Sequence, residues 1–187
     1  MGHYFIGIKI PTDICQGLLK WQEAVQPYVS YRQWVHVQDF HITLKFLGPV
    51  SDQQVSKLIE QLNDLMFVKR FESTITGVSF FGQRKQPRVL FAKLDHLNEL
   101  HQLKTEIEST CASLGFEEES RPFKPHITLA KKWKNPKKHL EQDLNNEIQP
   151  ILETIQMTEF HLFKIDPKTQ PKYEIIKTFH FTETGED

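Results

Sequence analysis

The spacing of apolar and polar residues predicts a chain that alternates between strands and amphipathic helices. Apolar side chains recur at every second position from Tyr4 to Ile10, and a second strand is expected from His41 to Leu47, ending at Gly48. In three other segments the apolar residues recur every three or four positions, which is the period of a helix. The first segment begins at Thr12 or Asp13, the second begins at Ser51, and the third spans Asn98–Leu114.

Further strand-like runs follow, bounded by turn residues. They are Phe71–Phe80, Val89–Lys93, His126–Ala130, Ile155–Phe163 and Tyr173–Thr182. Gly82–Pro87 predicts a hairpin loop, Lys131–Asn146 a loop with a helix, and Thr182–Asp187 a frayed acidic tail. Because helices and hairpin-like strand pairs are intermixed, the sequence predicts an α+β fold with mainly antiparallel sheets. We expect residues 1–187 to form one domain of two lobes.

Composition narrows the class of protein. The chain has 187 residues, of which 39% are hydrophobic and 25% are charged, as in ordinary soluble globular domains. No apolar run approaches the roughly 20 residues that span a bilayer. Cys15 and Cys111 are far apart, so we expect neither a disulfide framework nor a thiolate metal site, and a cytoplasmic location. The net charge of −1 gives no sign of a nucleic-acid partner by itself.

One tetrapeptide occurs twice, as His41-Ile-Thr-Leu44 and His126-Ile-Thr-Leu129. Both copies lie in predicted strands, where successive side chains point to opposite faces. The histidine and threonine of each copy therefore share one face, and the aliphatic residues lie behind them. Each strand presents an imidazole beside a hydroxyl.

Two such strands facing each other could perform acid–base chemistry at phosphorus. Histidine titrates near neutral pH, so His41 and His126 can supply a general acid and a general base. Thr43 and Thr128 add hydroxyl donors for anionic oxygens. Two alternatives stay open: the pairs can be half-buried surface residues, or the histidines can bind zinc. Neither motif has a carboxylate or a second histidine two or four residues after its histidine, where a second metal ligand would stand. We therefore expect no metal and no cofactor.

The repeated motif resembles the signature of the 2H phosphoesterase superfamily. Longer segments are similar to the RNA 2′,3′-cyclic phosphodiesterases, also called 2′-5′ RNA ligase-like proteins, over Tyr4 to about Phe181. The segments are Phe5-Ile-Gly-Ile8, His41-Ile-Thr-Leu-Lys-Phe-Leu-Gly48, Pro87-Arg-Val-Leu-Phe-Ala92 and Arg121-Pro-Phe-Lys-Pro-His-Ile-Thr-Leu-Ala130. The family often has arginine where this chain has Lys131, and lysine loses bidentate phosphate geometry.

The resemblance implies a two-lobed, pseudo-twofold fold with both motifs facing a central cleft. It also implies metal-independent hydrolysis of RNA 2′,3′-cyclic phosphate ends to 2′-phosphates. His41 would be the acid on the departing 3′-oxygen and His126 the base that activates water; the residues alone do not say which is which. Thr43 and Thr128 would hold the phosphate, and Tyr173 is suggested near the cleft. Ligation in a 2′-5′ linkage would be a minor reverse reaction.

The local charge around the second motif favours an anionic substrate. Seven basic residues and no acidic ones lie between Arg121 and Lys138. We expect RNA contacts from Arg121, Phe123, Lys124, Lys131, Lys132 and Trp133, with the two aromatic rings stacking on bases. A second basic group, Arg84, Lys85 and Arg88, is expected on the other cleft wall.

Two other functions compete with this interpretation. The same site could act on small cyclic nucleotides or ADP-ribose cyclic phosphate, although seven cations suit a longer polyanion better. A non-catalytic module that binds RNA ends would not require two titrating residues at equivalent positions. We expect a monomer with no obligate protein partner and no membrane contact.

Overall fold

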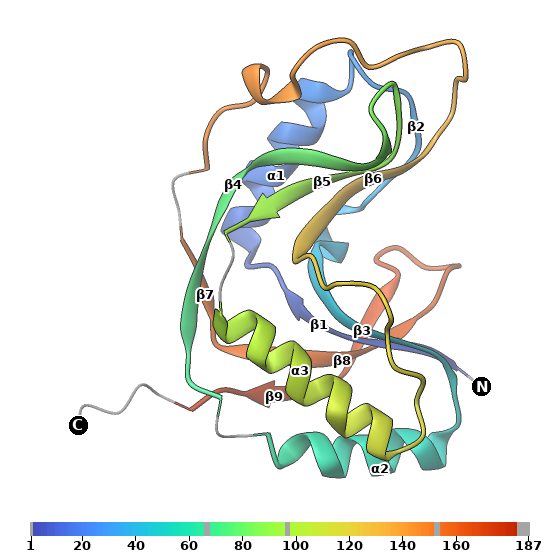
Figure 1. Cartoon of the computed structure of the whole chain (residues 1–187), viewed down its shortest axis with the longest axis vertical. Helices are drawn as coiled ribbons and strands as arrows, with labels where there is room; N and C mark the ends of the chain where they lie inside the picture. Colours follow the sequence, from blue (N-terminus) through green and yellow to red (C-terminus); the bar gives the residue numbers. More distant parts are fainter. Residues whose placement is uncertain (1, 66–67, 96–97, 152–153, 183–187) are drawn as a thin grey trace.

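The computed structural model describes residues 2–65, 68–95, 98–151 and 154–182. Figure 1 shows the chain and the element labels used below. The helices are α1 (Thr12–Val25), α2 (Asp52–Asn63) and α3 (Asn98–Ser113), with 3₁₀ turns at Val37–Asp39 and Leu144–Asn146. The strands are β1 (Gly2–Lys9), β2 (Tyr31–Trp34), β3 (His41–Val50), β4 (Phe71–Gln83), β5 (Gln86–Leu94), β6 (His126–Trp133), β7 (Thr154–Met157), β8 (Glu159–Ile165) and β9 (Tyr173–His180).

The nine described strands form one curled sheet whose strand pairs are antiparallel. Its order is β7-β4-β5-β6-β3-β1-β8-β9, and β2 pairs with β6 beside β3. The expected α+β fold with mainly antiparallel pairing is confirmed. Strands β3 and β6 meet in the middle of this order through Ile42 and Ile127, which are both fully buried. The two repeated motifs therefore lie side by side at the centre of the sheet.

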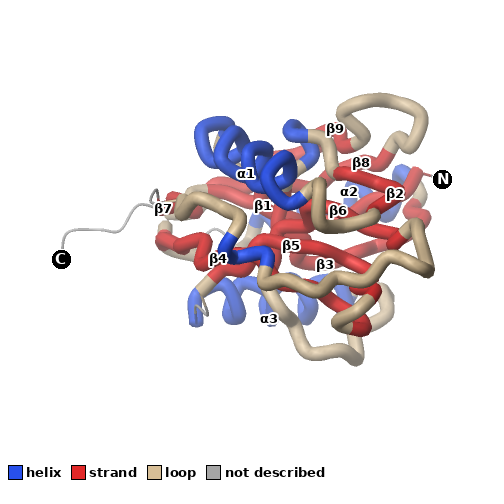
Figure 2. The backbone as a smooth tube through the Cα atoms, turned by 90° about the horizontal axis from the view of Figure 1, so that it is seen from above, coloured by secondary structure: helices blue, strands red, loops and turns tan. Residues whose placement is uncertain are grey.

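Helices cover the sheet on both sides (Figure 2). Helix α1 buries Ile14, Leu18 and Val25 against it, at the expected helical spacing. Helix α3 buries Leu100, Leu103 and Ile107, and α2 lies beside α3. Apolar residues from both sides of the sheet join one core. No helix in the described part of the chain has the length and apolar character needed to cross a membrane.

Several predicted boundaries were wrong. Strand β3 does not end at Gly48: the pairing with β1 skips Leu47, and Gly48 takes a φ of +72°, so the strand continues through a bulge. The Ile155–Phe163 run forms two strands that pair with different partners, β4 and β1. The Lys131–Asn146 segment begins as the end of β6 and contains only the 3₁₀ turn at Leu144–Asn146 among its described residues. Residues 183–187 of the expected tail lie outside the described residues.

Candidate active site

The four motif residues lie on one face of the sheet centre. Ile42 and Ile127 pair across β3 and β6 and point into the core. Side chains alternate along each strand, so His41, Thr43, His126 and Thr128 share the opposite, half-buried face. In β1, the strand that pairs with β3 in the sheet, Gly7 lets the two backbones lie close together, because a Cβ at this position would lie 2.6 Å from the Ile42 carbonyl oxygen. The expected juxtaposition of the two motifs is present in the structure.

His41 is held at both ring nitrogens. Nδ1–H donates to the Asp39 carbonyl oxygen, with 2.7 Å between the heavy atoms. A carbonyl oxygen can only accept, so this bond assigns the proton to Nδ1. In the neutral ring, Nε2 then accepts from the Thr43 hydroxyl at 2.9 Å. Nε2 of His41 is thus paired with the hydroxyl of its own motif.

Aromatic rings surround His41. Phe5 lies 4.7 Å and Tyr173 5.0 Å from its ring centroid. Burial among these rings lowers the pKa of His41 to about 4; the Asp39 hydrogen bond opposes the shift and the Lys131 charge adds to it. His41 is consequently neutral at pH 7 in the free protein.

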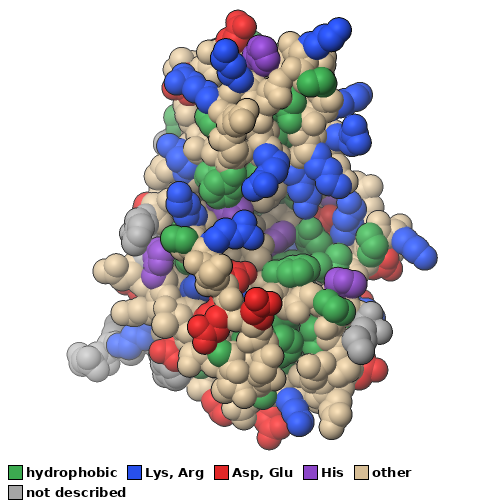
Figure 3. Space-filling view, turned by 45° about the vertical axis from the view of Figure 1, so that its right-hand side comes forward, with side chains coloured by type: hydrophobic (Ala, Val, Ile, Leu, Met, Phe, Trp, Pro, Cys, Tyr) green, Lys and Arg blue, Asp and Glu red, His purple; other side chains and the backbone are tan. Residues whose placement is uncertain are grey.

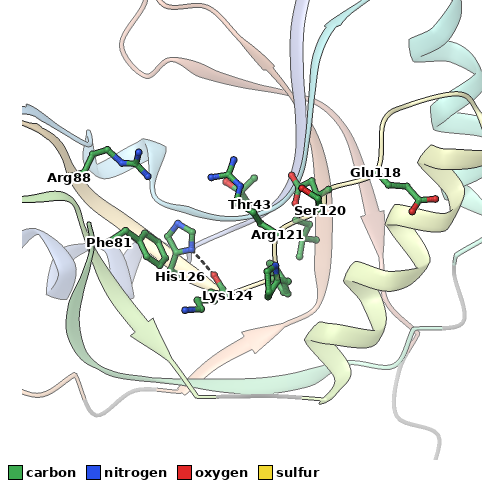
Figure 4. A pocket seen from close by; sticks show the side chains of 12 residues that line it. Thr43, Phe81, Arg88, Glu118, Ser120, Arg121, Lys124 and His126 are labelled. Carbon is green, nitrogen blue, oxygen red and sulfur yellow. Dashed lines mark hydrogen bonds between the residues drawn. The ribbon is translucent and has the colours of Figure 1, made fainter. Parts of the chain in front are cut away.

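His126 repeats this arrangement. Nδ1–H donates to the carbonyl oxygen two residues earlier, that of Lys124, at 2.7 Å (Figure 4). The rings of Phe81 and Phe91 lie 5.0 and 5.2 Å from the imidazole. Burial lowers the pKa of His126 as well. The described residues supply no hydrogen bond to its Nε2, so the lone pair of this nitrogen is available to a ligand.

A buried carboxylate connects His41 to β9. Asp39 is 4% exposed, and its oxygens accept from the backbone N–H of Lys172 at 2.9 and 3.1 Å and of Tyr173 at 3.3 Å. The same residue therefore holds the imidazole through its carbonyl and the segment that carries Tyr173 through its side chain. Asp39 was not anticipated, because these partners are backbone groups more than 130 residues away.

Two adjoining cavities open at the motifs. One, of about 380 Å³, is lined by His41, Thr43, Thr128, Lys131 and Tyr173, among others. The other, of about 570 Å³, is lined by Thr43, Arg88, Arg121, Lys124 and His126. Thr43 borders both, so the cavity at His41 and the cavity at His126 adjoin. Figure 3 shows recessed histidine atoms with lysines and arginines gathered around them.

The expected RNA contacts fall at different distances from the motifs. Arg121, Phe123 and Lys124 line the larger cavity, and Lys131 lines the smaller one. Partial burial and the charges of Lys172 and Lys132 lower the pKa of Lys131. The same neighbouring positive charges attract an anion to this cavity. Lys132 and Trp133 instead line a third hollow. Phe123 packs edge-on against His101, at 5.3 Å between ring centroids.

A buried lysine holds one wall of the larger cavity. Lys45 is 1% exposed, and its ammonium contacts the Glu108 carboxylate and the Glu117 carbonyl oxygen. Glu108 also accepts from the backbone N–H of Glu119 at 2.9 Å. This network ties the segment before Arg121 to α3.

Histidine, cysteine and acidic side chains are the usual protein ligands of metal ions. Within the described ranges, no three histidine, cysteine or acidic side chains cluster closely enough to form a metal site. Cys15 and Cys111 are free and buried.

Comparisons with known proteins find a matching family and relatives that are RNA 2′,3′-cyclic phosphodiesterases. The family described as the AKAP7 2′5′ RNA ligase-like domain matches residues 3–181. An RNA 2′,3′-cyclic phosphodiesterase of Bacillus subtilis (strain 168) is 32% identical over 184 residues, covering 96% of this chain and 97% of that protein. The enzyme of the same name from Geobacillus stearothermophilus is 31% identical over 179 residues, 95% of this chain, but the match spans only 56% of that protein's length.

Solved structures share the fold. Escherichia coli LigT in complex with 3′-AMP has a TM-score of 0.81 at 23% identity, covering 97% of this chain and 98% of that one. TT0787 of Thermus thermophilus has a TM-score of 0.80 at 22% identity, covering 98% of this chain and 100% of that one. The shared fold extends over nearly the whole chain.

Proposed function

The chain belongs to the AKAP7 2′5′ RNA ligase-like domain family of 2H phosphoesterases, and we propose that it hydrolyses 2′,3′-cyclic phosphates at RNA 3′ ends to 2′-phosphates. The observation that carries the proposal is the pair of His-x-Thr motifs on one sheet face. Each histidine is fixed by its Nδ1–H to a carbonyl two residues earlier, so the proton-transferring nitrogen of each is Nε2, which meets the Thr43 hydroxyl in His41 and has no partner among the described residues in His126. The RNA 2′,3′-cyclic phosphodiesterases to which this chain is similar give the substrate class.

The reaction is a displacement at phosphorus by water. Nε2 of His126 takes a proton from the attacking water, whose oxygen forms the new bond to phosphorus. The bond from phosphorus to the 3′-oxygen breaks, and His41 delivers a proton to that oxygen. When Nε2 of His41 carries a proton it no longer accepts from Thr43, so the Thr43 hydroxyl turns and donates, with that of Thr128, to the non-bridging oxygens as negative charge develops there.

This assignment of roles follows the resemblance and agrees with the hydrogen bonds. The free lone pair on Nε2 of His126 suits a base. His41 must gain a proton to act as the acid, and its pKa of about 4 leaves it neutral at pH 7 in the free protein. A bound phosphodiester places negative charge beside the ring, which raises the pKa of His41. The substrate itself therefore promotes the acid form.

The remaining features of the proposal concern the whole chain. It acts as one domain of two lobes over residues 1–187, as a monomer that needs no metal ion. A cytosolic setting agrees with the free, buried thiols of Cys15 and Cys111. Ligation of a cyclic end to a 5′-hydroxyl, the reverse reaction, is the minor activity because water is far more concentrated than RNA ends.

A small cyclic nucleotide is the second candidate substrate. Cavities of about 380 and 570 Å³ fall within the usual range for sites of single small ligands. The charge around the hollow favours RNA over this alternative, because a single nucleotide needs fewer cations than line it.

The test uses an RNA oligomer that ends in a 2′,3′-cyclic phosphate, incubated with the protein in chelator. We expect conversion to a 2′-phosphate end, identified by chromatography against both phosphate isomers as standards. A 3′-phosphate product would contradict the proposed roles of the two oxygens. Turnover of small cyclic nucleotides alone would favour the second candidate, and binding with no turnover of either would favour a non-catalytic module.

A further inference from the structure

A third hollow adjoins the larger cavity at Arg88. It has a volume of about 470 Å³ and is lined by Gln86, Arg88, Lys132, Trp133, Lys134 and Pro136, called here the basic hollow. Arg88 also lines the larger cavity, so the two spaces share a wall. In the sheet, Val89 pairs with Lys131, and the residues just beyond this pair, Arg88 and Lys132, face the basic hollow together.

The cations of the basic hollow are uncompensated. Arg88, Lys132 and Lys134 are exposed, and the side chain of none of them makes a hydrogen bond or ion pair with the residues that the structure describes. Its lining contains no acidic side chain. The opposite wall of the larger cavity, by contrast, carries Glu118 and Glu119. A polyanion that enters the site is therefore attracted toward the basic hollow.

Hydrogen bonds within the protein hold the backbone around the basic hollow in place before any ligand binds. Lys132 has a φ of +65°, a left-handed conformation that lysine seldom adopts, and this kink lets neighbouring Lys132 and Trp133 line the same space. Lys134 N–H donates to the Ser30 carbonyl oxygen at 2.7 Å. The Gln86 side chain donates to the Pro136 carbonyl oxygen, which closes the far rim.

Trp133 can offer only its ring to a ligand. Its indole N–H donates to the carbonyl oxygens of Asn135 at 2.8 Å and Lys138 at 3.2 Å. Tyr31 packs edge-on against the ring, with 5.2 Å between centroids. A ring that is held in place and has no free polar atom suits stacking on a base, which tolerates any sequence.

We propose that the basic hollow binds an internal phosphodiester and its base in a single-stranded RNA whose cyclic end lies between His41 and His126. The inference rests on the proposed function and deepens it. It makes the preferred substrate an oligonucleotide rather than a cyclic mononucleotide. The RNA strand then runs from its cyclic end between the histidines, past Arg88, to Lys132 and Lys134.

The test compares two substrates, adenosine 2′,3′-cyclic phosphate and a hexa-adenylate with the same cyclic end. For single strands, each phosphate contact contributes a salt slope of about 0.7, which corresponds to roughly fivefold in affinity at 0.1 M salt. Because the proposal places one internal phosphodiester in the basic hollow, the double variant Lys132→Ala/Lys134→Ala should lower the ratio of kcat/KM for the hexamer to that for the mononucleotide roughly fivefold. The matched control is Lys137→Ala, an exposed lysine of the same segment outside the basic hollow. It should keep the wild-type ratio.

A binding measurement keeps the two proposals separable. Fluorescence anisotropy with a labelled hexamer ending in a 2′-phosphate should show a salt slope lower by about 0.7 in the double variant. If both substrates are hydrolysed with an unchanged ratio and slope, the basic hollow does not bind RNA and the proposed function stands. An equal loss in Lys137→Ala also overturns the inference, because diffuse attraction then explains the effect. If neither substrate is hydrolysed but the slope falls, the proposed function fails and the RNA contact stands.

Discussion

The change Asp39→Asn separates positioning from chemistry at His41. The buried carboxylate accepts from two backbone N–H groups, those of Lys172 and Tyr173, while the carbonyl of the same residue holds His41. Asparagine keeps the volume but only one accepting oxygen, and it removes the negative charge. The variant should thus lose a hydrogen bond, the alignment of Tyr173 with His41, and the charge that favours protonated His41.

The size of the stability effect follows from the hydrogen bonds. A hydrogen bond to a charged group contributes about 1.5–3 kcal/mol. In Asp39→Asn one oxygen can still accept from both backbone N–H groups, but the Lys172 N–H loses its bond to the second carboxylate oxygen, where asparagine carries an N–H₂ donor. The free energy of unfolding should fall by about 2 kcal/mol, measured by urea denaturation. Removing the charge lowers the pKa of His41 further, so the high-pH limb of the kcat profile should move to lower pH.

Asp95→Asn is the matched control for this experiment. The Asp95 carboxylate accepts from Thr74 N–H at 2.8 Å and from the Ser73 hydroxyl at 3.1 Å, and it contacts neither histidine. This variant should lose comparable stability and keep the wild-type pH profile. If Asp39→Asn matches Asp95→Asn in kcat and in pH profile, Asp39 has only a structural role and the reasoning is refuted.

Three further predictions concern stability and phosphate binding. The pKa of His41, about 4 against 6.5 for the unfolded residue, means that the unfolded chain binds more protons between these values. Stability should accordingly fall by about 3 kcal/mol from pH 7 to pH 4, and His41→Gln should lack this part of the urea-unfolding difference. Thr128→Val should lower kcat about tenfold or more with the same fold by circular dichroism, since one donor to the developing charge is lost; unchanged kcat would remove Thr128 from the site. Lys45→Met removes one of the two lysines that pair with Glu108, and Lys104 remains, so the free energy of unfolding in urea should fall by about 1.5–3 kcal/mol; a loss below about 1 kcal/mol would show that the Lys45 pair is not a support.

The sequence is sufficient to predict which side chains of the two motifs share a face of the sheet. Alternation along two strands puts His41 with Thr43 and His126 with Thr128, and the pairing of Ile42 with Ile127 in the sheet agrees with that expectation. Local patterns are enough here because the period of a strand decides which side chains share a face.

Long-range supports could not be predicted. Asp39 acts on backbone N–H groups in β9 and just before it, and Lys45 meets Glu108 from another element, so no local pattern records either contact. The short strand β2 has four residues, too few to establish a period. The left-handed backbone at Lys132 depends on packing around β6 and has no glycine to mark it.

The most direct test of the central claim is turnover of a cyclic-ended RNA oligomer, in chelator, by His41→Ala and His126→Ala. The control is His161→Ala, which removes a buried histidine bonded to Thr178 on the same sheet, outside both cavities at the motifs. We expect kcat/KM to fall about 10²–10⁴-fold in each site variant, with native circular dichroism, and to stay near wild type in the control. A folded His41→Ala or His126→Ala protein with near-wild-type turnover would contradict the acid–base account.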